Sequence, residues 1–149
     1  MISSYLLFLL SERLFGVKLS GAIEILTWRK SRQVPLSYSY IEGLIDYRGT
    51  VYPIFNLAQR FGLTKPGAIG FTPEEPASME KNRSIILLEE NKMPFGIIVD
   101  SVVKMTKLEE SALAPAKALG LEPKFIKGLA YDDDQEIMIL DFERLLHAG

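Results

Sequence analysis

The segment Tyr40-Ile-Glu-Gly-Leu-Ile-Asp-Tyr-Arg-Gly-Thr-Val-Tyr-Pro-Ile-Phe-Asn-Leu57 contains two short apolar runs separated by a polar turn. The runs Leu44–Tyr47 and Val51–Phe55 are too short for typical helices and rich in aromatic and β-branched residues, so they predict two β-strands. The turn at Arg48–Thr50 carries a glycine, which favours a tight hairpin. Asn56 is typical of a helix N-cap. The segment therefore predicts a hairpin followed by a short helix.

The same pattern recurs later in the chain without a gap. Tyr40-Ile-Glu-Gly-Leu aligns with Phe125-Ile-Lys-Gly-Leu, and the match continues through the hairpin, so that Ile54 falls on Ile139. A second ungapped match places Phe15-Gly16 on Phe95-Gly96. Chance similarity between β-rich segments is the competing explanation. Two matches in the same order favour a duplicated β unit, which we interpret as two small barrels side by side.

The rest of the chain is also mostly β. Six further apolar runs predict strands at Tyr5–Leu10, Leu14–Leu19, Ile85–Leu88, Phe95–Val99, Phe125–Tyr131 and Ile137–Leu140, with hairpin turns at Ser11–Arg13, Glu90–Lys92 and Asp132–Gln135. Several runs lack alternation, which indicates strands buried on both faces. Each half is too small to bury a good core alone, so we expect the halves to share one. The Gly- and Pro-containing segment 62–83 predicts a mobile surface loop between them.

Composition limits the possible functions. The 149 residues are 48% hydrophobic and 24% charged, values that fit a domain with a core. The net charge of −2 leaves no basic excess for phosphates, which argues against nucleic-acid binding. The absence of cysteine excludes disulfides and thiolate metal sites. No apolar run reaches membrane-spanning length, so we expect a cytoplasmic protein without membrane insertion.

The sequence offers little machinery for catalysis. His147 is the single histidine and lies beside the C-terminus, where a solvated side chain is the simpler interpretation. The run Asp132-Asp133-Asp134 lacks the spacing of a calcium-binding loop. No glycine-rich stretch opens into a helix with Gly-Lys-Ser/Thr. We therefore predict no catalytic residues, no metal and no cofactor, and we expect a binding function.

As a whole, the chain resembles the CheW family of chemotaxis coupling proteins. The family signature, an Ile-x-Gly step before an Arg-Gly hairpin and a proline-containing strand, is similar to residues 40–57. Further stretches agree in order: Leu14-Phe15-Gly16-Val17, Phe95-Gly96-Ile97-Ile98-Val99-Asp100-Ser101-Val102 and Phe125-Ile126-Lys127-Gly128-Leu129. The resemblance implies that residues 1–149 form one CheW-like domain, made of two SH3-like five-stranded β-barrels on a shared hydrophobic core, with short helices.

The resemblance also implies a function. The family has no enzymatic activity and bridges the cytoplasmic tip of chemoreceptors and the regulatory domain of the histidine kinase CheA, which has the same fold. The chain would then be cytoplasmic and recruited to receptor arrays at the membrane. Asp46-Tyr47 stands where the family signature has Asn-Leu, which leaves open the receptor, the kinase and the pathway. A generic SH3-like peptide-binding module, using Tyr38, Tyr40, Tyr47 and Tyr52, remains the alternative.

The strongest partner-binding candidate is Arg48, because an arginine at a hairpin tip can bind a partner's carboxylate with two hydrogen bonds. Gly49 supports the turn backbone. Gly43, Asp46 and Tyr47 lie on the same edge, although Gly43 has a counterpart in Gly128 and so fits a structural role equally well.

The resemblance implies four more partner-binding residues. Ala22 and Glu24 follow the first hairpin, and Val102 and Met105 follow the second Phe-Gly hairpin, where family members contact partners. A different observation concerns charge: when Tyr40 is aligned with Phe125, Arg48 falls on Asp133, so equivalent hairpin tips differ in sign. Unlike tips would allow head-to-tail contacts with another copy or with a homologous kinase domain.

Overall fold

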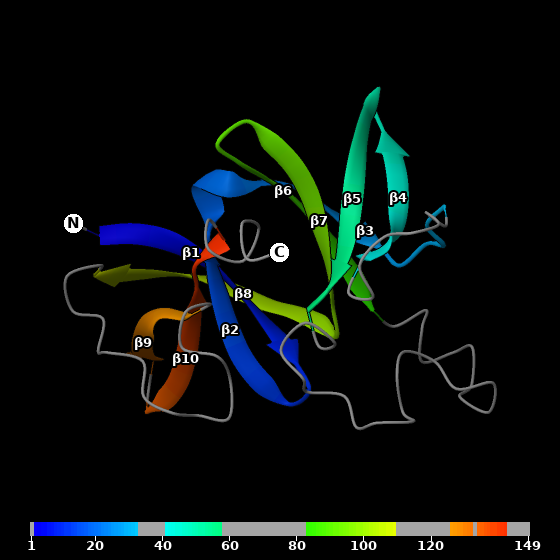
Figure 1. Cartoon of the computed structure of the whole chain (residues 1–149). Helices are drawn as coiled ribbons and strands as arrows, with labels where there is room; N and C mark the ends of the chain where they lie inside the picture. Colours follow the sequence, from blue (N-terminus) through cyan, green and yellow to red (C-terminus); the bar gives the residue numbers. More distant parts are fainter. Residues whose placement is uncertain (1, 33–40, 58–82, 110–125, 133, 143–149) are drawn as a thin grey trace. The chain divides into compact units, whose positions relative to one another are not determined.

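A computed structural model describes residues 2–32, 41–57, 83–109, 126–132 and 134–142 (Figure 1). These residues form two compact units. Unit 1 comprises residues 1–21 and 102–149, and unit 2 comprises residues 22–101. Each unit contains one five-stranded sheet. Besides the strands, the described residues include one short 3₁₀ turn, η1 (Leu19–Gly21), and two single helical residues, Leu57 and Phe142. The predicted mainly β fold with two five-stranded units is confirmed.

The sheet of unit 1 has the strand order β8-β1-β2-β10-β9. Its strands are β1 (Ile2–Leu10), β2 (Arg13–Lys18), β8 (Ser101–Glu109), β9 (Ile126–Asp132) and β10 (Gln135–Leu140). The hairpins β1–β2 and β9–β10 are antiparallel, and β10 joins β2 in parallel.

The sheet of unit 2 repeats this arrangement with the order β3-β6-β7-β5-β4. Its strands are β3 (Ala22–Thr27), β4 (Ile41–Tyr47), β5 (Thr50–Asn56), β6 (Ser84–Glu90) and β7 (Met93–Val99). The hairpins β4–β5 and β6–β7 are antiparallel, and β5 joins β7 in parallel.

The sequence repeat reappears in the register of the strands. Leu7 pairs with Gly16 in unit 1, and Leu87, which the repeat aligns with Leu7, pairs with Gly96 in unit 2. The parallel pairs agree as well, because Ile139 lies beside Gly16 as Ile54 lies beside Gly96. The two halves of the sequence do not each build one sheet, however. The first half supplies β1 and β2 to unit 1 and β3, β4 and β5 to unit 2, and the second half does the reverse.

Each unit has its own cluster of buried side chains. In unit 1 the cluster contains Tyr5, Leu7, Leu14, Ala130, Ile137 and Ile139. In unit 2 it contains Leu26, Ile45, Tyr52, Ile54, Ile85, Leu87 and Ile98. Consecutive residues such as Ile85–Leu88 are all buried, so both faces of the central strands are covered, as their lack of alternation predicted.

Two strands were missed by the sequence pattern. They are β3 and β8, which occupy corresponding edges of the two sheets. Only Leu26 is buried in β3, and no residue of β8 is fully buried. Edge strands with polar and apolar residues in alternation lack the continuous apolar run that revealed the central strands.

The hairpins turn through residues with positive φ, as type I′ turns require. Both residues of the β1–β2 turn have this conformation, Ser11 at 51° and Glu12 at 65°. Asn91 and Lys92 do so in the β6–β7 turn. The helix predicted to follow Asn56 agrees at Leu57, which is helical, and Phe142 after β10 is helical too. The rest of the helix after Asn56, and the loop predicted at 62–83 apart from Arg83, lie outside the described residues.

Candidate functional site

The β4–β5 hairpin presents Arg48 at its tip, as predicted. Arg48 has a φ of 50° and Gly49 a φ of 82°, so the pair forms a tight turn. Arg48 is exposed, and its guanidinium carbon lies 5.2 Å from the centroid of the Tyr47 ring. This cation–π contact restrains the side chain while its N–H groups stay available to a partner.

Asp46 has an intramolecular partner that the sequence did not reveal. The Arg32 guanidinium lies 3.1 Å from Asp46 Oδ2 and donates a 3.3 Å hydrogen bond to Oδ1. Arg32 is held beside β4 by two backbone hydrogen bonds with Leu44, each 2.8 Å. Both charged side chains are about 60% exposed, so the pair is weak in energy but fixes the Asp46 carboxylate toward Arg32. Asp46 therefore helps to hold the hairpin edge in place.

Gly43 has a structural explanation. A Cβ at this position would collide with the backbone oxygen of Arg32 and lie 2.5 Å from Ser31 Oγ. Gly43 is buried, so its role in this structure is to let the segment at Ser31–Arg32 approach β4 closely. A partner contact through Gly43 is therefore less direct than one through Arg48 or Gly49.

The remaining candidates lie on the two missed edge strands. Ala22 and Glu24 are on β3 in unit 2, at the edge opposite β4, and both are partly exposed. Val102 and Met105 are on β8 in unit 1, where Met105 is 64% exposed. The structure thus gathers Gly43, Asp46, Tyr47, Arg48 and Gly49 on one hairpin and places the other four elsewhere.

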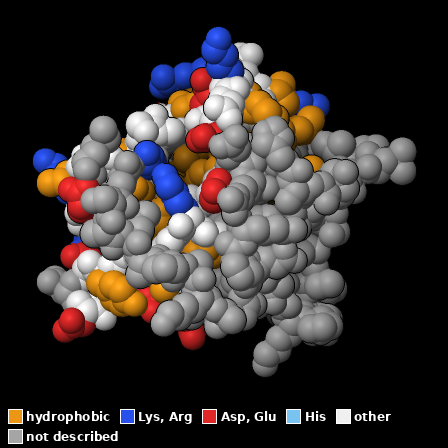
Figure 2. All heavy atoms as spheres, turned by 60° about the vertical axis from the view of Figure 1, so that its left-hand side comes forward, with side chains coloured by type: hydrophobic (Ala, Val, Ile, Leu, Met, Phe, Trp, Pro, Cys, Tyr) orange, Lys and Arg blue, Asp and Glu red, His pale blue; other side chains and the backbone are white. Residues whose placement is uncertain are grey.

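The edge strands expose apolar side chains that the sequence pattern did not single out. Ile23 and Ile25 are each over two-fifths exposed on β3, and Val103 is similarly exposed beside Met105 on β8. Figure 2 shows hydrophobic side chains at the surface, next to charged ones, on the face that it presents. Exposed apolar pairs on edge strands favour contacts with a partner.

No group of three or more acidic, histidine or cysteine side chains among the described residues could hold a metal ion. Asp132, from the acidic run, instead forms an ion pair of 2.6 Å with Lys104, and Asp133 and His147 lie outside the described residues. In the described part of the chain, no helix is long and apolar enough to cross a membrane.

The fold and the hairpin signature together define the class of protein. The family model of the CheW-like domain matches residues 4–149, so the chain belongs to the CheW-like domain family.

Individual relatives agree with this assignment. The chain is 27% identical over 140 residues to the chemotaxis protein CheW of Treponema pallidum, covering 93% of this chain and 78% of the relative. It is 26% identical over 140 residues to a probable chemotaxis protein CheW of Rhizobium etli, covering 93% and 83% of the two chains. The crystal structure of the scaffolding protein TtCheW from Thermoanaerobacter tengcongensis matches with a TM-score of 0.79 and 27% identity, over 95% of this chain and 85% of that one.

Proposed function

We propose that this chain is a non-enzymatic adaptor that couples the cytoplasmic tip of chemoreceptors to the regulatory domain of a CheA-type histidine kinase. Support comes from the match of the CheW-like domain to residues 4–149 and from relatives that are chemotaxis and scaffolding proteins. In this proposal residues 1–149 act as one domain, and the protein works in the cytoplasm at receptor arrays.

The observation that carries the proposal is the β4–β5 hairpin. Its exposed Arg48 stacks on Tyr47, and Gly49 follows with open space where a Cβ would lie. A partner can therefore approach the guanidinium closely, and arginine is among the residues that dominate the energy of protein interfaces. The ion pair between Arg32 and Asp46 stabilises the neighbouring edge of this surface.

The exposed apolar pairs supply the second element of a binding surface. Ile23 and Ile25 flank Glu24 on β3, and Val103 lies two residues before Met105 on β8. An edge strand of this kind can contact a partner through apolar side chains and through its own backbone. We propose that Ala22, Glu24, Val102 and Met105 take part in these contacts.

The generic peptide-binding alternative is less well supported. A groove for proline-rich peptides needs clustered exposed aromatic side chains. Tyr52 is buried in the core of unit 2, and Tyr47 is partly buried against the same core. Tyr38 and Tyr40 lie outside the described residues.

Titration calorimetry with the purified kinase regulatory domain and with a receptor cytoplasmic fragment tests the proposal. Arg48→Glu should weaken binding to at least one of them by about tenfold or more, since interface arginines often contribute about 2 kcal/mol or more. Lys127→Glu, an exposed substitution on β9 with the same change in charge, is the matched control and should bind normally. Equal affinities for the chain and for Arg48→Glu would exclude the hairpin tip as a contact.

A further inference from the structure

Methionine supplies all the sulfur of this chain. The sequence has five methionines and no cysteine, so a peroxide that reaches the protein can oxidise sulfur only as a thioether. Methionine ranks among the residues most often buried. Among the described residues Met138 follows this rule with 5% exposure, whereas Met93 is 47% exposed and Met105 is 64% exposed. In the described part of the chain, Met93 and Met105 are therefore the accessible targets of oxidation.

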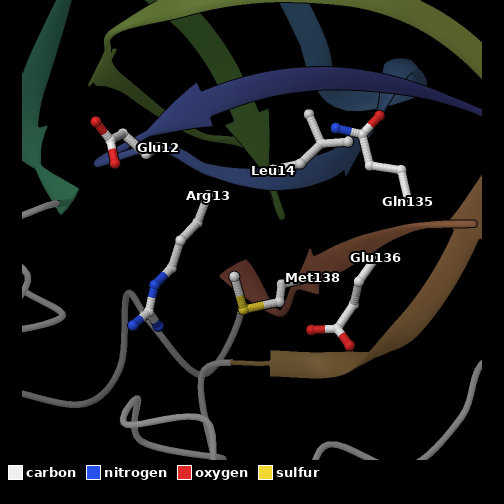
Figure 3. Close-up of a pocket in the computed structure, with 6 residues that line it drawn as sticks. All are labelled: Glu12, Arg13, Leu14, Gln135, Glu136 and Met138. Atoms are coloured by element: carbon white, nitrogen blue, oxygen red, sulfur yellow. The ribbon is translucent and has the colours of Figure 1, made fainter.

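Met138 shows how the fold protects a sulfur. It lies on β10 beside Phe15 of β2. A hollow of about 370 Å³ borders it, and Figure 3 shows the six side chains that line this hollow: Glu12, Arg13, Leu14, Gln135, Glu136 and Met138. Because the hollow leaves so little of Met138 accessible, a peroxide should oxidise its sulfur slowly in the folded chain.

Met105 lies on the outward side of β8. Side chains alternate along a strand, so Lys104 and Leu108 point to the side opposite Met105. On that side Leu108 packs against the buried cluster of unit 1, and Lys104 forms its 2.6 Å ion pair with Asp132 of β9. Met105 shares the outward side with Val103, which is also exposed. A change in the Met105 side chain should therefore leave the packing of unit 1 intact.

The position of Met105 links its chemistry to partner binding. β8 is an edge strand of its sheet, and Val103 and Met105 form its exposed apolar pair. In the adaptor function that we propose, this pair contacts a partner, where burial of an apolar and adaptable thioether stabilises the complex. A sulfoxide is polar, and its burial against apolar side chains without a hydrogen-bond donor costs free energy. Oxidation of this one sulfur should therefore weaken the contact without unfolding the chain.

We propose that Met105 is a site of reversible oxidation that controls partner binding through β8. A lone pair of the Met105 sulfur attacks one oxygen of hydrogen peroxide, the S–O bond forms as the O–O bond breaks, and a proton passes to the departing oxygen, which leaves as water. The sulfur loses two electrons and the peroxide gains them. A sulfoxide reductase that uses a thiol reductant reverses the step and yields the thioether, water and a disulfide of the reductant. The control of binding rests on the adaptor function, whereas the selectivity of oxidation does not.

Peroxide treatment of the full chain tests the selectivity. Peptide mass spectrometry should find Met105 oxidised at least about fivefold faster than Met138 in the folded chain. Unfolding in denaturant should remove this difference, because the protection of Met138 comes from burial. Equal rates for the two residues in the folded chain would overturn the assignment of Met105.

Titration calorimetry with the receptor and kinase fragments tests the control of binding. Oxidation should weaken the binding of at least one fragment by about fivefold or more, since burial of a methionine side chain contributes at least that factor, and sulfoxide reductase should restore it. Met105→Leu has no sulfur at this position, so its affinity for that fragment, whatever the starting value, should be unchanged by peroxide. Met93→Leu removes the other exposed sulfur and is the matched control, which should still lose binding on oxidation.

Two results would overturn the control of binding by Met105. One is an oxidised chain that binds as tightly as the reduced chain, and the other is a Met105→Leu chain that loses as much affinity on oxidation as the unchanged chain. Circular dichroism verifies that each oxidised sample remains folded. A reduced chain that binds neither fragment would instead contradict the adaptor function, and with it the control of binding, but would not alter the rates of oxidation.

Discussion

Gly96→Ala should destabilise the chain through one contact with Ile54. An added Cβ would lie 2.6 Å from Ile54 Cδ1 and 3.1 Å from Leu87 Cδ2, inside a core where both side chains are fully buried. Overpacking of this kind costs about 1–3 kcal/mol. Alanine recovers about 0.5–1 kcal/mol of the backbone entropy that glycine loses in a strand. The net loss of stability should therefore lie between about 0 and about 2.5 kcal/mol, centred near about 1 kcal/mol.

The equivalent substitution in unit 1 supplies the comparison. An added Cβ at Gly16 would lie 3.0 Å from both Ile139 Cδ1 and Leu7 Cδ2, which is less severe than the contact at Gly96. Gly16→Ala should therefore destabilise the chain less than Gly96→Ala. Chemical denaturation measures both changes in the free energy of unfolding, provided that the slope of this free energy against denaturant concentration is the same for each variant.

A double mutant tests whether Ile54 Cδ1 causes the loss of stability in Gly96→Ala. Ile54→Val removes Cδ1 and alone costs about 0.5–1.5 kcal/mol. In combination with Gly96→Ala it also removes the collision, so the double mutant should be more stable than the sum of the single effects by about 1 kcal/mol. Additive effects of the two substitutions would refute the close contact between Gly96 on β7 and Ile54 on β5.

Three further substitutions test local features. Glu12→Gly should raise stability by about 0.5–1 kcal/mol, seen as a higher melting temperature, because glycine adopts a φ of 65° without steric cost. A lower melting temperature would contradict the turn conformation. Asp132→Asn should cost about 1 kcal/mol or less by removing the ion pair with Lys104, and added salt should shrink that difference; a salt-independent loss would point to another cause. Arg32→Ala should change stability by less than about 1 kcal/mol, because its ion pair with Asp46 is exposed, and a larger loss in denaturation would show that Arg32 packs more than this pair suggests.

The central strands were predictable because their signal is local. Runs such as Ile85–Leu88 are continuously apolar, and their turns carry residues suited to tight hairpins. The ungapped repeat aligned Gly16 with Gly96, and these two glycines occupy matching positions in the strand registers of the two sheets. Arg48 was identifiable for the same reason, since a glycine follows it between two apolar runs.

What the sequence could not show depends on contacts distant along the chain. The exchange of strands between the two sheets depends on which strands pair with each other. The local sequence pattern of either half does not determine that pairing. The ion pair of Arg32 with Asp46 joins residues 14 positions apart through a segment with no strand pattern. The edge strands β3 and β8 were missed because exposed side chains interrupt their apolar residues.

The adaptor function is tested most directly by assembling the three components. A receptor cytoplasmic fragment, displayed on vesicles, is sedimented with the kinase in four samples. One sample lacks the chain, and the others contain the chain, Arg48→Glu or Lys127→Glu. The chain and Lys127→Glu should carry the kinase into the pellet with the receptor, and Arg48→Glu should do so at least about tenfold less effectively. Sedimentation of the kinase to the same extent with and without the chain would contradict the account.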